Sequence, residues 1–155
     1  MTYLAPALKK VGAFLFSQPK EDKPLKSFRD NAHRTVFLEA SRNMNRSNYA
    51  VLAALYLLTA DSRLWNQVKD CVHHNTIPFD QMEPKNHSTN SYAMFSVAKD
   101  LYLGTNHMSL CDLADTELIP PKIFVIICNS MAVFRLGLDA IKEAPERKAK
   151  SGRKE

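Results

Sequence analysis

The stretch YAVLAALYLLTA, Tyr49–Ala60, is apolar around the whole circumference of a helix and decides the fold. Within it, only Tyr49, Tyr56 and Thr59 carry a polar side-chain atom. A helix that is hydrophobic on every side is typical of the centre of a helical bundle. The sequence therefore predicts a buried central helix around which the other helices pack.

Helical periodicity continues on both sides of this stretch. Upstream, residues 30–44 form a predicted helix, and downstream Asp61 or Ser62 is placed to cap another that reaches about residue 72. The predicted inward positions of these two helices are Ala32, Val36, Phe37, Ala40 and Met44, and Leu64, Trp65, Val68 and Val72. Both helices would lay an apolar stripe against the central one.

The second half of the chain begins with a long connection, residues 73–90, which Ile77, Phe79 and Met82 are expected to pin to the body. A helix is predicted from near Ser91 to Gly104, a short capped turn at Ser109, and a last helix over residues 122–142. Their predicted core contacts are Tyr92, Phe95, Leu101 and Tyr102, and Ile123, Ile127, Phe134, Leu138 and Ile141. No Asn-Gly or Asp-Gly hairpin turn separates alternating runs. The expected fold is all-α, a single helical bundle of about six helices.

Length and composition agree with one soluble domain. The chain has 155 residues, of which 45% are apolar and 24% charged. Its three cysteines are widely spaced and odd in number, so they predict no disulfide framework and favour a reducing cytoplasm. The longest strongly apolar stretch, Ile123–Cys128, is far shorter than the roughly 20 residues of a membrane span, so no transmembrane segment is expected.

The net charge of +5 lies at the two ends of the chain. Residues 1–30 and 142–155 each hold six basic and three acidic residues, whereas residues 31–141 hold nine basic and ten acidic. The predicted division is an N-terminal helix and linker (1–26), a helical domain (27–141) and a disordered basic tail (142–155). The tail either aids solubility or contacts nucleic acid through Arg147, Lys148, Lys150, Arg153 and Lys154.

An amphipathic helix is predicted over residues 2–17, before a linker that contains Pro19 and Pro24. Lys9 and Lys10 lie on the side opposite its apolar stripe. The predicted partner-binding residues of this stripe are Leu4, Leu8, Val11, Phe14 and Leu15. Such a helix can dock on its own body, on another protein or a second copy, or on a membrane surface.

Cysteine and histidine side chains give two weaker hypotheses. Cys71, His73 and His74 lie close enough in sequence to suggest zinc, although the first two have one intervening residue and no second ligand pair exists. Further possible ligands are His87, His107 and Cys111. Cys71 with His73 or His107 could also form a nucleophile–base pair. The simpler interpretation is a cysteine at a helix end, followed by solvated loop histidines.

Two nucleic-acid hypotheses use different helices. Arg29 and His33 stand at i and i+4, so they share a face. Some helical nucleases place an arginine and a histidine on one helix face with four to six residues between them, whereas here there are three. Residues 49–58 and 62–72 could form a helix-turn-helix, in which Arg63, Asn66, Gln67 and Lys69 would face the DNA. Against this, Asp61 precedes these four residues and Asp70 follows them, and the turn has no glycine. Glycine-rich phosphate-binding motifs are absent from the sequence.

Several landmarks in this order carry a resemblance to a family. They are His33 with Phe37, AALYLLTA (Ala53–Ala60), Trp65, Ile77–Phe79, AKDLYLG (Ala98–Gly104), and Phe124 with RLGL (Arg135–Leu138). Residues 28–141 thereby resemble small bacterial and phage-associated proteins that share a domain of unknown function. The resemblance implies an all-helical, cytoplasmic protein and supplies no activity. Asp100 and Leu103 depart from it, since asparagines are common there.

These observations favour a non-enzymatic protein, one that acts by protein–protein interaction or regulation and is associated with a mobile element. Its partner would be another protein or a second copy of the chain, and no cofactor is expected. The second hypothesis is a nucleic-acid-associated protein that uses the basic tail and the helix-turn-helix. The third is a metal-dependent or nuclease-like enzyme.

Overall fold

The computed structural model of the chain describes residues 26–142. Within this range the chain forms six α-helices and three short 3₁₀ turns, and no strand occurs there. The helices are α2 (Asn31–Ser41), α3 (Tyr49–Thr59), α4 (Ser62–Val68), α5 (Thr89–Leu103), α6 (Leu110–Ala114) and α7 (Pro121–Leu136). The 3₁₀ turns are Lys69–Cys71, Phe79–Gln81 and Gly137–Ile141. The predicted all-α bundle is therefore confirmed.

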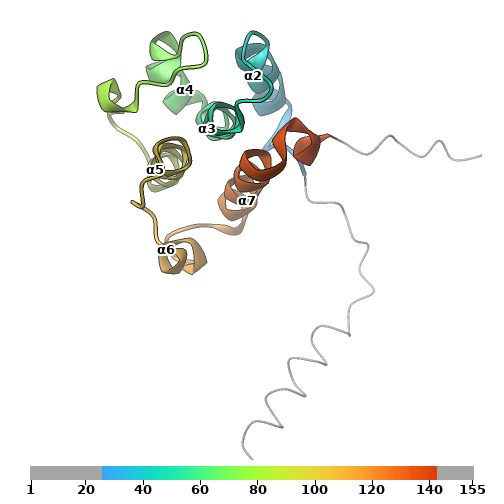
Figure 1. The fold of residues 1–155 in the computed structure, drawn as a ribbon. Helices are drawn as coiled ribbons and strands as arrows, with labels where there is room; N and C mark the ends of the chain where they lie inside the picture. Colours follow the sequence, from blue (N-terminus) through green and yellow to red (C-terminus); the bar gives the residue numbers. More distant parts are fainter. Residues whose placement is uncertain (1–25, 143–155) are drawn as a thin grey trace, which may run out of the picture.

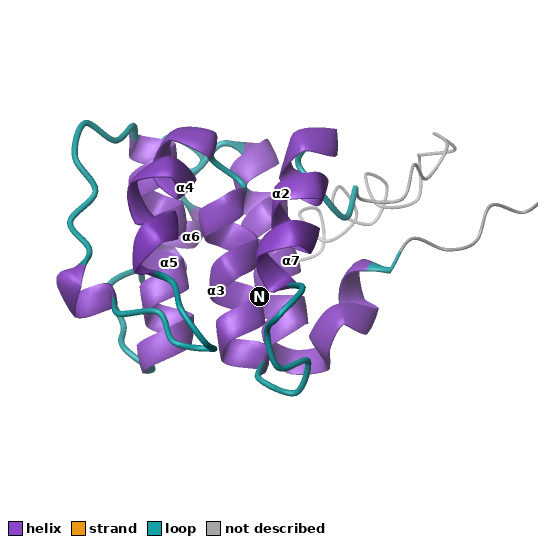
Figure 2. Cartoon of the chain, turned by 90° about the horizontal axis from the view of Figure 1, so that it is seen from above, coloured by secondary structure: helices purple, strands orange, loops and turns teal. Residues whose placement is uncertain are grey.

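The central position of α3 is the main feature of the bundle. Figure 1 shows α3 enclosed by α2, α4, α5 and α7. Its residues from Val51 to Thr59 are all buried, and α5 and α7 make the most extensive contacts with it. In the view of Figure 2, α5 and α7 lie on the two sides of α3. The apolar stretch thus forms the predicted central helix, with the last helix packed against it.

Local signals set several helix ends. The Asp61 carboxylate caps α4 by accepting a 2.9 Å hydrogen bond from the backbone N–H of Leu64. Ser109 and Asp112 form the predicted capping box of α6. Gly104 ends α5 in the left-handed conformation at φ +71°, which glycine adopts without strain. The start of α5 differs from the prediction, since Ser88 caps it and the helix begins at Thr89.

The last helix is shorter than predicted. It ends at Leu136, because Gly137 takes a φ of +75° and the chain continues as a 3₁₀ turn instead of reaching residue 142 as a helix. A Cβ on Gly137 would lie 2.7 Å from a ring carbon of Tyr49. Only a residue without a side chain therefore lets the end of α7 approach α3 this closely.

Three predicted core residues are exposed. Phe134 is exposed because the buried row of α7 ends at Val133, just before the turn at Gly137. Tyr92 is exposed because Ser91 and Met94 take the inward positions at the start of α5. The inward positions of α2 belong to His33 and Phe37, which leaves Ala32 outside.

The long connection is pinned as predicted, because Ile77, Phe79 and Met82 are all buried. It opens with a tight turn that the sequence analysis did not predict. The backbone groups of His73 and Thr76 exchange two hydrogen bonds of 3.2 and 2.8 Å, while His74 and Asn75 take φ angles of +44° and +64°. Two positive φ values are typical of a type I′ turn, and here His-Asn replaces the usual Asn-Gly.

Candidate functional site

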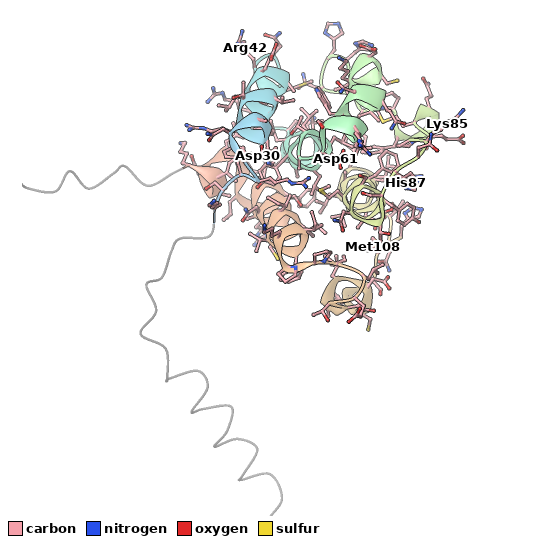
Figure 3. The ribbon with its side chains drawn as sticks, turned by 180° about the vertical axis from the view of Figure 1, so that it is seen from behind. Asp30, Arg42, Asp61, Lys85, His87 and Met108 are labelled. Atoms are coloured by element: carbon pink, nitrogen blue, oxygen red, sulfur yellow. The ribbon has the colours of Figure 1, made fainter. Side chains whose placement is uncertain are left out.

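A hollow of about 460 Å³ lies where the N-terminal ends of α2, α4 and α5 meet. Figure 3 labels one residue at each end: Asp30 before α2, Asp61 before α4 and His87 before α5. The lining also includes Arg29, Arg63 and Ser91. A concave surface with several polar groups is the first place to look for a binding site.

Asp61 joins two of the helix ends that line this hollow. Besides capping α4, its second carboxylate oxygen accepts a 2.7 Å hydrogen bond from the Ser91 hydroxyl at the start of α5. Burial alone would raise the pKa of Asp61, but hydrogen bonds from Leu64 and Ser91 and the nearby charge of Arg29 hold it below its ordinary value. An ionised carboxylate therefore fastens two helix ends together.

The histidine of the Arg29–His33 pair is part of the core. The backbone N–H of Arg29 donates to Nδ1 of His33 at 3.0 Å, so Nε2 carries the proton and donates to the carbonyl of Tyr56 at 2.8 Å. Burial lowers the pKa of His33, which favours the neutral ring. Both ring nitrogens are thus engaged inside the protein. No nitrogen remains to take a proton from a nucleic-acid substrate, and the nuclease hypothesis loses its base.

The Arg29 side chain of the hollow also serves the fold. The Arg29 guanidinium donates to the carbonyl of Ala60 at 3.0 Å, at the end of α3. Across residues 26–142, no buried side-chain nitrogen or oxygen lacks a hydrogen-bond partner. The buried polar groups of the hollow are therefore satisfied from within the protein, and Asp61 and Arg29 join the helix ends there.

The predicted metal candidates do not gather into a site. Cys71 is half-buried beside the core, whereas His73 and His74 are exposed in the tight turn. Among the described residues, no three His, Cys, Asp or Glu side chains are placed to hold a metal ion. His107 instead pairs with Asp100, whose carboxylate lies 2.7 Å from Nδ1 and also accepts from the backbone of His107 and Met108. This anchor of the α5–α6 loop was missed from the sequence.

The helix-turn-helix hypothesis meets two obstacles. In that motif the first helix crosses the DNA backbone while the second enters the major groove. Here the first helix is α3, which is buried on all sides, and α4 has only seven residues. Gln67 is also occupied, because its amide exchanges hydrogen bonds of 2.7 and 3.0 Å with the backbone of Lys85. The hairpin exists and leaves Arg63, Asn66 and Lys69 exposed, but its buried first helix is not placed to cross a DNA backbone.

A second candidate surface lies on α7 and is apolar. Two rows of residues with i, i+4, i+7, i+11 spacing share one side of the helix. We call this side the outer face; it consists of Phe124, Val125, Cys128, Asn129, Met131, Ala132, Arg135 and Leu136. None of the eight is buried, and the exposed fractions of Phe124, Met131 and Leu136 are 41%, 37% and 60%. Only Arg135 carries a charge.

The inner face of α7 is apolar as well. Ile123, Ile127 and Val133 on that face are buried in the core that surrounds α3. Since both faces are apolar, α7 together with the 3₁₀ turn that follows it, Pro121–Ile141, contains an 18-residue window with a mean hydropathy of 1.7. It is the only described helical segment long and apolar enough to cross a membrane by length and composition. The expectation of no transmembrane segment took only Ile123–Cys128 into account. One third of that window is buried inside the bundle.

The described chain begins beside the outer face of α7. The side-chain amide of Asn129 donates to the carbonyl of Lys26 at 3.0 Å and to the hydroxyl of Tyr56 at 3.2 Å. The Tyr56 hydroxyl in turn donates to the carbonyl of Ser27. Burial raises the pKa of Tyr56 to about 12, so this hydroxyl keeps its proton. The described chain therefore begins, at Lys26, beside the middle of α7.

The other predicted site residues lie outside the described residues. These are Leu4, Leu8, Val11, Phe14 and Leu15 of the apolar stripe, and Arg147, Lys148, Lys150, Arg153 and Lys154 of the tail. Comparison with family models, curated proteins and solved structures found no match. The resemblance described above stays a prediction, and the case for function depends on this chain's own surfaces.

Proposed function

We propose that this protein is a non-enzymatic, cytoplasmic interaction protein that binds an apolar helix of a protein partner on the outer face of α7. The observation that carries the proposal is that Phe124, Met131 and Leu136 are exposed together on the outer face of a helix whose other face is already packed. Exposed apolar groups that gather on one surface are typical of an interaction site.

The composition of the outer face fits a partner helix. Aromatic residues, methionine and arginine are enriched at protein interfaces, and the core of an interface is poor in charge. Phe124, Met131 and Arg135 supply these types along one row. Methionine adapts its shape to different partners, which suits a regulatory protein. Apolar side chains at i, i+3, i+4 and i+7 on the partner would match the spacing of the two rows.

Capture from the native cell with the full chain as bait tests the proposal. The variants Met131→Asp and Phe124→Asp place a charge on the outer face, and Leu110→Asp on α6 is the matched control because Leu110 is 84% exposed. We expect the wild type and Leu110→Asp to retain the same protein, and both outer-face variants to lose it. Circular dichroism checks that all variants are folded. Capture that survives both outer-face variants would overturn the proposal.

The basic tail supports a second candidate, binding to nucleic acid. Six of its 14 residues are Lys or Arg, and contact with phosphates is driven by counterion release. Titration of a short DNA duplex at physiological salt, with and without residues 142–155, tests it. Loss of DNA binding upon deletion would support this function. Equal or absent binding by both chains would exclude the tail as its basis.

A further inference from the structure

We propose that the chain's own N-terminal segment, residues 2–17, covers the outer face of α7 and that a partner must displace it. This inference rests on the proposed function of that face and adds its regulation. The segment carries the apolar stripe Leu4, Leu8, Val11, Phe14 and Leu15, which needs an apolar surface to pack against. The outer face is such a surface, and the described chain starts beside it.

The tether places the segment within reach. Lys26 is held by Asn129, which is seven residues from Leu136 on α7 and therefore lies on almost the same side of the helix. Ten residues separate Leu15 from Lys26, and a linker of this length spans up to about 33 Å. Both ends of the outer face, Phe124 and Leu136, lie within about 11 Å of Asn129 along the helix axis. The linker reaches either end with slack.

The two surfaces also match in length and chemistry. A helical stripe from Leu4 to Leu15 is about 16 Å long, and the outer face from Phe124 to Leu136 is about 18 Å long. Each presents large apolar side chains that would leave water on docking. Lys9 and Lys10, opposite the stripe, would then face solvent and replace an apolar surface by a charged one.

Attachment to the same chain favours this occupant over a second copy. A short flexible linker gives a tethered segment an effective concentration in the millimolar range. A free partner, or the segment of another molecule, must compete against that concentration. The segment would therefore lower the affinity of the outer face for a partner until the partner binds more strongly or the segment is removed from the face.

A disulfide trap in the full chain tests the inference. Cys128 lies in the middle of the outer face, and Cys71→Ser with Cys111→Ser leaves it as the only native thiol. A cysteine is then introduced in the stripe, as Leu8→Cys or Val11→Cys, or on its opposite side as the matched control Lys9→Cys. A disulfide forms only when the two Cα atoms come within about 7 Å. Non-reducing electrophoresis and peptide mapping distinguish bonds within one chain from bonds between chains.

We expect an intrachain disulfide with Cys128 in at least one stripe variant, formed at least about tenfold faster than in the Lys9→Cys control. Bonds between two chains only would assign the face to a second copy and overturn the inference. Equal rates for the stripe and control variants, or no bond in either stripe variant, would also overturn it.

A second readout separates this inference from the proposed function. Leu8→Asp should release the outer face, so the full chain with this change should capture more of the partner than the wild type, while Lys9→Asp should not. A trapped intrachain disulfide without face-dependent capture would retain the docking of residues 2–17 on the outer face, but would refute the proposed function and with it the displacement by a partner. Face-dependent capture without a disulfide, and without a gain from Leu8→Asp, would refute the inference alone.

Discussion

The two helices α3 and α7 are both strongly apolar, yet the protein uses them differently. Residues Val51–Thr59 of α3 are buried without a break, since four helices surround them. On α7 only the inner face is buried, and Phe124, Met131 and Leu136 face outward. Apolar sequence alone therefore does not tell whether a helix is covered. The number of helices packed around it decides whether an apolar helix is buried. Within the described residues, no helix packs on the outer side of α7.

Truncation of a leucine to alanine should have very different effects on stability in α3 and in α7. Leu55→Ala in α3 removes a fully buried side chain and should lower the free energy of unfolding by about 3–5 kcal/mol. Leu136→Ala on the outer face should cost less than about 1 kcal/mol, because no described helix covers this side chain and a docked N-terminal segment can leave the face without unfolding the bundle. Urea denaturation measures both. Equal losses would mean that the outer face of α7 is part of the core.

A pair of glycine substitutions tests the close approach of α7 to α3. Gly137→Ala brings a Cβ against the Tyr49 ring and strains a positive φ, so we expect a loss of about 2–4 kcal/mol. Gly104→Ala shares the positive φ but meets open space, so about 1–2 kcal/mol is expected. Thermal and chemical unfolding give both values. A larger loss for Gly104→Ala would contradict the assigned contact with Tyr49.

Acidification should loosen the contact between α2 and α3. The pKa of His33 is lowered in the folded protein, so the unfolded chain binds a proton more readily. The stabilisation is therefore complete above the unfolded value of about 6.5 and is lost as the pH falls below it. His33→Gln should cost about 1–3 kcal/mol at pH 7.5 and remove most of the decline between pH 6.5 and 5. An unchanged pH profile in the variant would refute this role.

The sequence predicts the positions and ends of the helices better than it predicts which of their side chains are buried. Three local predictions are confirmed: the buried helix at Tyr49–Ala60, the end of α5 at Gly104 and the capping box at Ser109. They succeed because apolar content, a left-handed cap and a capping pair act within a few residues of the chain. Phe134 and Tyr92 were misplaced, because their exposure depends on where the chain turns and on which neighbours cover them. The role of His33 required two distant groups, the backbone of Arg29 and the carbonyl of Tyr56, which no local pattern reveals. The outer face of α7 could not be predicted either, because its exposure depends on which distant helices cover α7 in the fold.

The solvent exposure of the Met131 methyl group in the full chain tests directly whether residues 2–17 cover the outer face of α7. Its NMR signal is assigned with Met131→Leu, and line broadening by a soluble paramagnetic compound is compared with that of the buried Met94. If residues 2–17 cover the outer face, the Met131 signal will be as protected as that of Met94, and Leu8→Asp but not Lys9→Asp will expose it. Strong broadening of Met131 in the wild type, unchanged by Leu8→Asp, would contradict the claim.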